Sequence, residues 1–192
     1  MKIQSYWLFL SLTVLAILGI GVALADRDND EGGERFYSRW FKPDFMVFNN
    51  QESRLYQEEC GSCHFPFQPG FLPAASWQAM MSGLADHFGE DAELSDETRA
   101  RLLSYLTANS AGVVDREIPN KVMWSLRYIP NPQRITETAF FQHEHREIPP
   151  RLLEGEGEPI AFSNCDSCHT RAMQGSYDEH EIRIPGIGRW DD

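Results

Sequence analysis

The chain has 192 residues, a formal net charge of −12, four cysteines and six histidines. This length accommodates one domain or two small ones, and the 11 prolines and 14 glycines predict many turns and few long regular elements. The acidic balance excludes a nucleic-acid-binding protein, because phosphate backbones need a basic face. It suits a protein that is steered toward a basic partner surface.

The first 25 residues form an apolar segment typical of exported proteins. Lys2 precedes an uncharged run over residues 3–25, which ends in Ala23-Leu24-Ala25, a small-x-small site of the kind that signal peptidase cuts. We therefore expect residues 1–25 to be a signal peptide. An uncleaved anchor is the alternative, because the run is long enough to span a bilayer. In both cases the rest of the chain would be periplasmic, and cleavage would remove Lys2 and change the charge from −12 to −13.

Residues 26–51 are expected to be a tether. Its first part, residues 26–34, is acidic and contains glycine, which is typical of mobile segments. The part that follows is too aromatic for a plain linker, and we expect it to lie across a folded domain or to cover an edge of a cofactor. Its aromatic residues are Phe36, Tyr37, Trp40, Phe41, Phe45 and Phe48.

Residues 52–112 are predicted to form an N-terminal helical domain. A short helix over 52–60 is followed by an amphipathic helix over 76–88, which should end at Gly89. Ser95 is the expected N-cap of a third helix, with acidic residues in its first turn. The apolar positions of the two longer helices recur at spacings of three and four: Trp77, Met80, Met81, Leu84 and Phe88, then Leu102, Leu103 and Leu106.

Residues 113–192 are predicted to form an irregular C-terminal domain with few helices. Seven prolines, from Pro119 to Pro185, interrupt any long element. One helix is expected over 132–148, with proline in its first turn and two prolines after it, and a loop over 155–159. The predicted fold class is therefore mainly α, with two small domains.

All four cysteines lie in two copies of one pattern, Cys60-Gly61-Ser62-Cys63-His64 and Cys165-Asp166-Ser167-Cys168-His169. The pattern C-x-x-C-H is the attachment signature of c-type haem. Residues three apart share a helix face, so both sulfurs can bond the two vinyl groups of one porphyrin. The next residue is turned by about 100°, which lets the histidine reach the iron axially. The sequence thus predicts two haem c groups, with His64 and His169 as iron ligands.

Three other uses of paired cysteines explain the pattern less well. One structural zinc could bind both pairs, but zinc gives no reason for a histidine after each pair. A dithiol redox site of thioredoxin type requires a βαβ context, which is missing here. Structural disulfides are common in exported proteins, but they also leave both histidines unexplained.

The second axial ligand of each iron decides the function, because methionine raises the reduction potential, histidine lowers it, and an open site permits chemistry. For the first haem the candidates are Met80, Met81 and His87, all on the predicted helix 76–88. The position of His87 on the apolar face of that helix favours His87, while methionine serves well as a core filler.

For the second haem the candidates are His143, His145 and His180. His145 is favoured, because it shares a helix face with Thr138, Phe141 and Ile148, whereas His143 lies on a more mixed face. His180 lies in an acidic stretch that is typical of solvated surface. Met173 follows His169 too closely to cross the ring.

Several further stretches are distinctive: Leu72-Pro73-Ala74-Ala75-Ser76-Trp77, Gly83-Leu84-Ala85-Asp86-His87-Phe88-Gly89, Arg134-Ile135-Thr136-Glu137-Thr138, Glu144-His145-Arg146-Glu147-Ile148, and the stretch from Cys165 through Ile182-Arg183-Ile184-Pro185. Through these stretches the chain resembles the small periplasmic dihaem cytochromes c of proteobacteria over most of residues 52–186. Residues 1–51 and the last few residues fall outside this resemblance.

This resemblance implies an N-terminal domain similar to class I cytochrome c and a less regular C-terminal haem domain. It implies low-potential haems with two histidine ligands each, and by matched position it supports His87 and His145. Family members exchange electrons with a membrane-embedded b-type cytochrome and, in some species, with a small soluble high-spin haem protein. The expected contact with the membrane is limited to a retained N-terminal segment.

The expected function is therefore single-electron transfer rather than catalysis. A dihaem peroxidase is the alternative, which would need one open or releasable iron site and an acid–base group such as His143 or Glu144 beside it. A haem subunit docked permanently in a larger complex is a third hypothesis, which the aromatic segment over 36–48 would suit.

Overall fold

The fold is taken from a computed structural model, which describes residues 45, 48–127, 131–153 and 159–190. The predicted signal peptide, most of the tether and most of the loop over 155–159 lie outside these residues. Chain contacts separate residues 1–42 from residues 43–192, so everything described belongs to the second unit. The predicted boundary at residue 112 stays a prediction.

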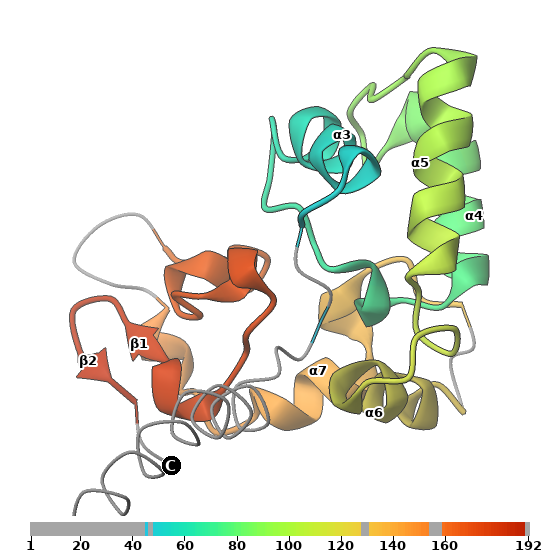
Figure 1. Ribbon diagram of the computed structural model, residues 1–192. Helices are drawn as coiled ribbons and strands as arrows, with labels where there is room; N and C mark the ends of the chain where they lie inside the picture. The colour runs from blue at the N-terminus through green and yellow to red at the C-terminus, as the bar shows by residue number, and fades with distance from the viewer. Residues whose placement is uncertain (1–44, 46–47, 128–130, 154–158, 191–192) are drawn as a thin grey trace, which may run out of the picture. The chain divides into compact units, whose positions relative to one another are not determined.

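The described residues of the N-terminal half form three α-helices, as predicted (Figure 1). They are α3 (Gln51–Cys60), α4 (Ala74–Ser82) and α5 (Asp96–Ala108), and α5 packs against both α3 and α4. Asn50 begins α3 with a capping box, in which its side chain accepts from Ser53 N at 2.7 Å. Ser95 caps α5 by accepting from Thr98 N at 3.1 Å. Both caps satisfy backbone donors that would otherwise lack partners.

The core lies where these helices meet the chain that follows. The apolar stripe of α5 is buried, since Leu102 and Leu106 are 0 % and 1 % exposed. Phe45 is also buried, and its N–H donates to Gly175 O at 3.1 Å, so this part of the aromatic segment packs on the fold. The other buried hydrophobic residues of this cluster are Tyr56, Phe71, Leu72, Trp77, Met81, Tyr105, Ala111, Val122, Leu126, Ile135 and Phe141.

The helix predicted over 76–88 is wrong at its C-terminal end. Helix α4 ends at Ser82, and Gly83 caps it by donating to Met80 O at 3.1 Å. Glycine favours such an ending because it loses more conformational entropy inside a helix than other residues do. Residues 84–86 then form a 3-10 turn, so His87 lies on a loop rather than on the helix face.

In the part of the C-terminal half that the structure describes there are two α-helices, of which one was not predicted and the other is much shorter than predicted. Helix α6 (Glu117–Ser125) was not expected, because Pro119 was assigned as a break. Pro119 is the third helical residue, where a backbone N–H has no partner inside the helix. The helix predicted over 132–148 is the much shorter α7 (Ala139–Glu144), because Thr138 is extended and separates it from the preceding turn.

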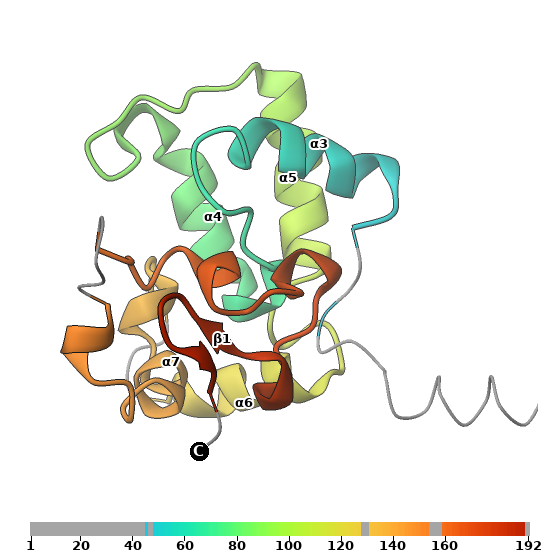
Figure 2. The same cartoon turned by 90° about the vertical axis from the view of Figure 1, so that its left-hand side faces the viewer.

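The remaining elements are short, which agrees with the many prolines and glycines. A two-stranded antiparallel hairpin pairs β1 (Arg183–Ile184) with β2 (Gly188–Arg189). Helix α6 packs against both α7 and the turn η1, which spans Pro69–Phe71 (Figure 2). The 3-10 turns are η1 (Pro69–Phe71), η2 (Leu84–Asp86), η3 (Ile135–Glu137), η4 (Pro150–Leu152), η5 (Cys165–Ser167), η6 (Ala172–Gln174) and η7 (Glu179–Glu181). The predicted mainly α fold class is confirmed. Within the described ranges, no helix combines the length and apolar character needed to cross a membrane.

Candidate functional site

The first cysteine motif begins at the end of α3. Cys60 is the last residue of the helix, and Cys63 and His64 follow in an exposed turn. Gly61 is required at this turn, because a Cβ there would collide with the backbone oxygen of Gln57. Burial raises the pKa of the Cys60 thiol to about 11, with smaller contributions from Glu59 and Cys63. Cys60 and Cys63 form no disulfide.

His64 is oriented as metal-binding histidines usually are. Its Nδ1 lies 2.8 Å from the carbonyl oxygen of Phe65 and can donate to it. Such a bond places the proton on Nδ1 and leaves Nε2 as the ligand atom. The ring of His87 lies opposite, with ring centres 6.1 Å apart and planes inclined by 21°.

A tight loop brings His87 to this position although no helix carries it. The N–H of His87 donates to Glu90 O at 2.7 Å, and Glu90 N donates back to His87 O at 3.2 Å. Phe88 and Gly89 between them have positive φ of 59° and 101°. Burial lowers the pKa of His87, followed by the effects of His64 and Arg134, so the imidazole is kept neutral.

The second motif lies on η5 and is held by the hairpin. The N–H of His169 donates to Cys165 O at 2.8 Å, and Arg183 at the start of β1 donates its N–H to Cys168 O at 2.9 Å. Burial raises the pKa of the Cys165 thiol to about 12. Burial also lowers the pKa of His169 to about 4, with a further contribution from His145. A neutral imidazole is the form that binds a metal.

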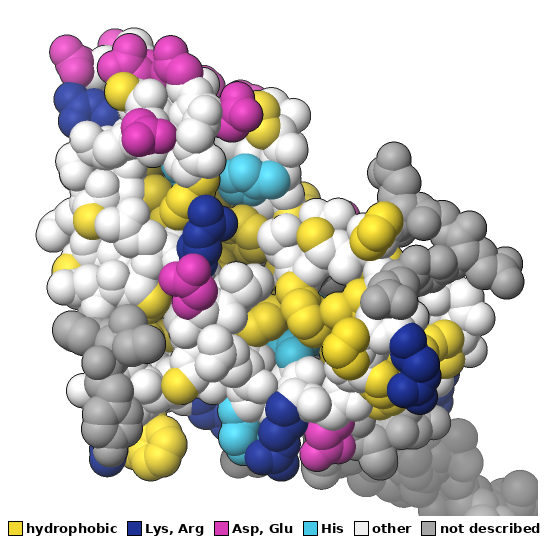
Figure 3. Space-filling view, turned by 180° about the vertical axis from the view of Figure 1, so that it is seen from behind, with side chains coloured by type: hydrophobic (Ala, Val, Ile, Leu, Met, Phe, Trp, Pro, Cys, Tyr) yellow, Lys and Arg dark blue, Asp and Glu magenta, His cyan; other side chains and the backbone are white. Residues whose placement is uncertain are grey.

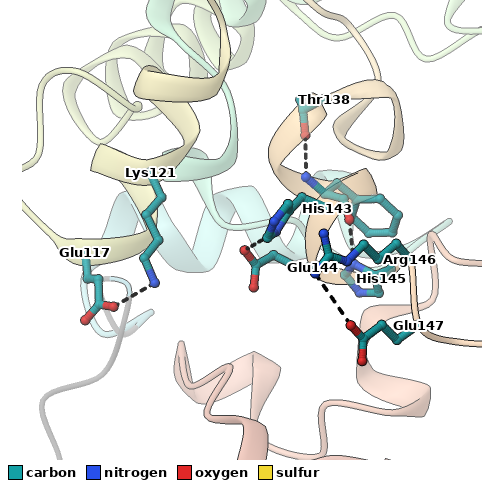
Figure 4. A network of polar contacts seen from close by, with 9 residues as sticks. Glu117, Lys121, Thr138, His143, Glu144, His145, Arg146 and Glu147 are labelled. Atoms are coloured by element: carbon teal, nitrogen blue, oxygen red, sulfur yellow. Dashed lines mark hydrogen bonds and ion pairs between the residues drawn. The ribbon is translucent and has the colours of Figure 1, made fainter. Parts of the chain in front are cut away.

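His145 faces His169 across a similar gap. Their ring centres are 6.1 Å apart, and their planes are inclined by 70°. His145 is the C-cap residue of α7, and both its N–H and its Nδ1 lie within hydrogen-bond distance of Phe141 O, at 3.1 and 2.9 Å (Figure 4). The Phe141 ring stacks on the imidazole at 3.9 Å. Burial lowers the pKa of His145.

The other candidate ligands lie elsewhere. His143 is exposed and its Nδ1 is 3.3 Å from Glu144 Oε1, on the polar side of α7 (Figure 4). His180 is exposed on η7, and Met81 is buried in the core. Met80 packs against that core. Met173 lines a hollow of about 480 Å³ together with Cys63, His64 and Asp166.

The two pairs of imidazoles fit one haem iron each. An imidazole nitrogen lies about 2 Å from a bound metal. The centre of the imidazole ring lies farther from the metal than this nitrogen, by somewhat less than the length of a C–N bond, ~1.33 Å. Two imidazoles on opposite sides of one metal therefore have ring centres about 6 Å apart, as both pairs here do. Histidine side chains also reach the surface beside gathered hydrophobic ones, which suits an apolar porphyrin ring (Figure 3).

A bare metal ion fits the described residues less well. Among them, no three histidine, cysteine or acidic side chains are grouped as a metal site would require. No two of the four cysteines are joined in a disulfide.

Sequence reasoning missed the groups that hold the distal histidines. The Phe141 carbonyl fixes His145, and the spacing of four residues between them was the available signal. Arg134, whose guanidinium lies 4.0 Å from the centre of the Phe88 ring, was also missed. No pattern in the sequence places Arg134 beside a loop that lies more than forty residues away.

Comparison with known proteins is consistent with this geometry. Residues 56–177 match the family described as dihaem cytochrome c. A dihaem cytochrome c from Shewanella baltica is 36% identical, with a TM-score of 0.60, covering 74% of this chain and 100% of that one. One from Rhodobacter sphaeroides is 36% identical, with a TM-score of 0.59, covering 69% and 99%. No curated protein sequence matches the chain. A match over most of the folded part, with both C-x-x-C-H motifs present, shows that the chain belongs to the dihaem cytochrome c family and carries two haem c groups.

Proposed function

We propose that the chain is a periplasmic one-electron carrier in which each haem iron is held between two histidines. Cys60, Cys63, His64 and His87 would hold haem 1, and Cys165, Cys168, His169 and His145 would hold haem 2. The observation that carries this proposal is the 6.1 Å separation of ring centres in both pairs. Haem c supplies a reversible one-electron oxidation and reduction, and closed axial sites suit that role better than catalysis.

The residues around each pair hold the imidazoles in fixed orientations. Hydrogen bonds from Nδ1 to the carbonyls of Phe65 and Phe141 orient His64 and His145. The two backbone hydrogen bonds between His87 and Glu90 fix the loop that carries His87. The hydrogen bond from His169 N to Cys165 O fixes the backbone of His169. Ligands that do not move between oxidation states minimise the reorganisation that accompanies electron transfer. This arrangement supports a carrier rather than a peroxidase, which would have to release one ligand.

The two haem sites also adjoin each other. The hollow beside Cys63 and His64 is lined in part by Asp166 of the second motif. The buried Gln68 side chain donates to Ala172 O at 3.4 Å, and Ala172 N in turn donates to His169 O at 2.9 Å. This connection supports a relay in which an electron enters through one haem and leaves through the other. A membrane b-type cytochrome and a small soluble haem protein are the proposed partners, on the grounds of the sequence resemblance and the acidic charge.

Histidine replacement tests the ligand assignment. In H87A and in H145A we expect both haems to stay attached through their thioethers, while one centre of the two becomes high-spin in the optical and spin-resonance spectra. H143A and H180A are the matched controls and should leave both centres low-spin, since both side chains are exposed. An H87A or H145A protein that remains fully low-spin would overturn the assignment for that haem. A high-spin fraction in the unmodified protein would favour the enzyme instead.

A further inference from the structure

We propose that Arg134 is a positioning residue for haem 1, which holds the loop that carries His87 and raises the reduction potential of that haem. The proposal rests on the proposed ligation by His87. Arg134 precedes η3, far from the loop in sequence, yet its guanidinium lies 4.0 Å from the centre of the Phe88 ring. Phe88 follows His87 directly, so this contact acts on the backbone that presents the ligand.

The Phe88 backbone needs such support. Its φ of 59° is the only positive value among the described residues other than glycine. A bulky side chain is rarely found in this region, because its Cβ crowds the backbone, and the conformation persists only when the surroundings hold it. The Phe88 ring is 45 % exposed, so the core does not hold it. The Phe88 ring contacts the neighbouring His87 ring, at 4.8 Å between ring centres, and the guanidinium of Arg134, which stacks on it.

The charge of Arg134 also acts on the haem site. The guanidinium of Arg134 stacks on the Phe88 ring, and the centre of that ring lies 4.8 Å from the centre of the His87 ring, so the positive charge lies close to the imidazole. A ferric haem carries one more positive charge than a ferrous haem, so a neighbouring cation favours the ferrous form and raises the potential. Glu137 offsets this charge only weakly, because its Oε1 lies 3.7 Å from Arg134 Nε and the pair is exposed.

Arg134 also lies at the start of the segment that carries the second distal histidine. Arg134 is the N-cap residue of η3, which leads through Thr138 directly into α7 and His145. The Arg134 side chain thus connects the loop that carries His87 to the segment that carries His145.

Charge and stacking can be separated by substitution in the full haem-loaded protein. In R134Q we expect the midpoint potential of one haem to fall while that of the other stays. In R134K the charge remains, so the potential should stay close to that of the parent. The loss of the planar stack should nevertheless speed amide exchange over residues 84–92. F88G removes the ring and should speed the same exchange without the loss of charge. R151Q, which removes an exposed arginine of η4, is the matched control and should change neither quantity.

Unchanged potentials and unchanged loop exchange in R134Q would overturn the inference. A fall of both potentials by the same amount would also overturn it, because it would indicate a general change of charge. Failure of the ligand assignment is distinguishable, since it is read from the spin state of H87A and not from Arg134 variants. If H87A becomes high-spin and R134Q behaves like the parent protein, the ligation stands and only the role of Arg134 is refuted.

Discussion

Thr138 is expected to control the stability of the segment that carries His145. Its side chain is 1 % exposed and makes two hydrogen bonds, accepting from Phe141 N at 3.1 Å and donating to Ile135 O at 2.7 Å. The carbonyl of Phe141 then accepts from His145, so the hydroxyl is connected to the ligand through a single residue (Figure 4). Helix α7 has only six residues, and its first turn depends on this cap.

Replacement of Thr138 by valine removes the hydroxyl and keeps the branched shape. Loss of a helix N-cap costs about 1 kcal/mol. Loss of the second hydroxyl hydrogen bond adds roughly 1 kcal/mol, although the Ile135 carbonyl still accepts from Thr138 N at 3.0 Å. For a domain of this size, about 2 kcal/mol corresponds to a fall in Tm of about 4–8 °C. T138S keeps both hydrogen bonds, so its Tm should fall much less than that of T138V. Thermal unfolding followed by circular dichroism, together with the low-spin fraction of haem 2 during heating, measures both effects. Equal Tm values for T138V and T138S would refute this account of the cap.

Three further predictions concern the core, pH and the haem spectra. L102A should lower the free energy of unfolding in urea by about 2–5 kcal/mol, because Leu102 is fully buried. L103A, at a half-buried position, is the control, and an equal loss of unfolding free energy in both variants would contradict the prediction. In the chain prepared without haem, burial lowers the pKa of His169 to about 4, against 6.5 for an ordinary histidine, so the unfolded chain binds more protons between these values. The free energy of unfolding should therefore fall by up to ~1.4 kcal/mol per pH unit as the pH drops through this window. A urea unfolding midpoint that does not change with pH would disprove this prediction. The ring planes of His64 and His87 are inclined by 21°, so both imidazoles would interact with the same d orbital of an iron between them. The planes of His145 and His169 are inclined by 70°, so these two imidazoles would interact with different d orbitals. We thus expect two distinct low-spin resonance signals, and one signal accounting for both irons would count against the geometry.

Local sequence signals predicted the N-terminal helices well. The helix over 52–60 and the cap at Ser95 were correct, because each depends on residues that are close in sequence. The end of α4 was wrong, since the apolar spacing continues through Leu84 and Phe88 after the backbone has left the helix at Gly83. Periodicity reports which side chains are buried, but it does not report whether a glycine has already ended the helix.

The candidate site shows the same limit in a sharper form. His87 was selected because it would face the core from a helix, yet a loop with a bridge to Glu90 presents it. His145 was selected as part of a long helix face, yet it is the C-cap residue of a short helix. In both cases the apolar neighbourhood of the histidine was visible in the sequence. The backbone route to it depends on contacts between distant segments, such as Arg134 with Phe88, which no local pattern contains.

The buried thiols have a consequence for how the protein matures. Thioether formation needs a reactive sulfur, and a thiol whose pKa is raised to about 11 at Cys60 or about 12 at Cys165 is almost entirely protonated at neutral pH. In a chain made without haem, an alkylating reagent should therefore label the exposed Cys63 well before these two. Equal labelling of the three would contradict this order. The compact chain is thus a poor substrate for its own modification, and the porphyrins must be installed before the polypeptide closes around its sulfurs.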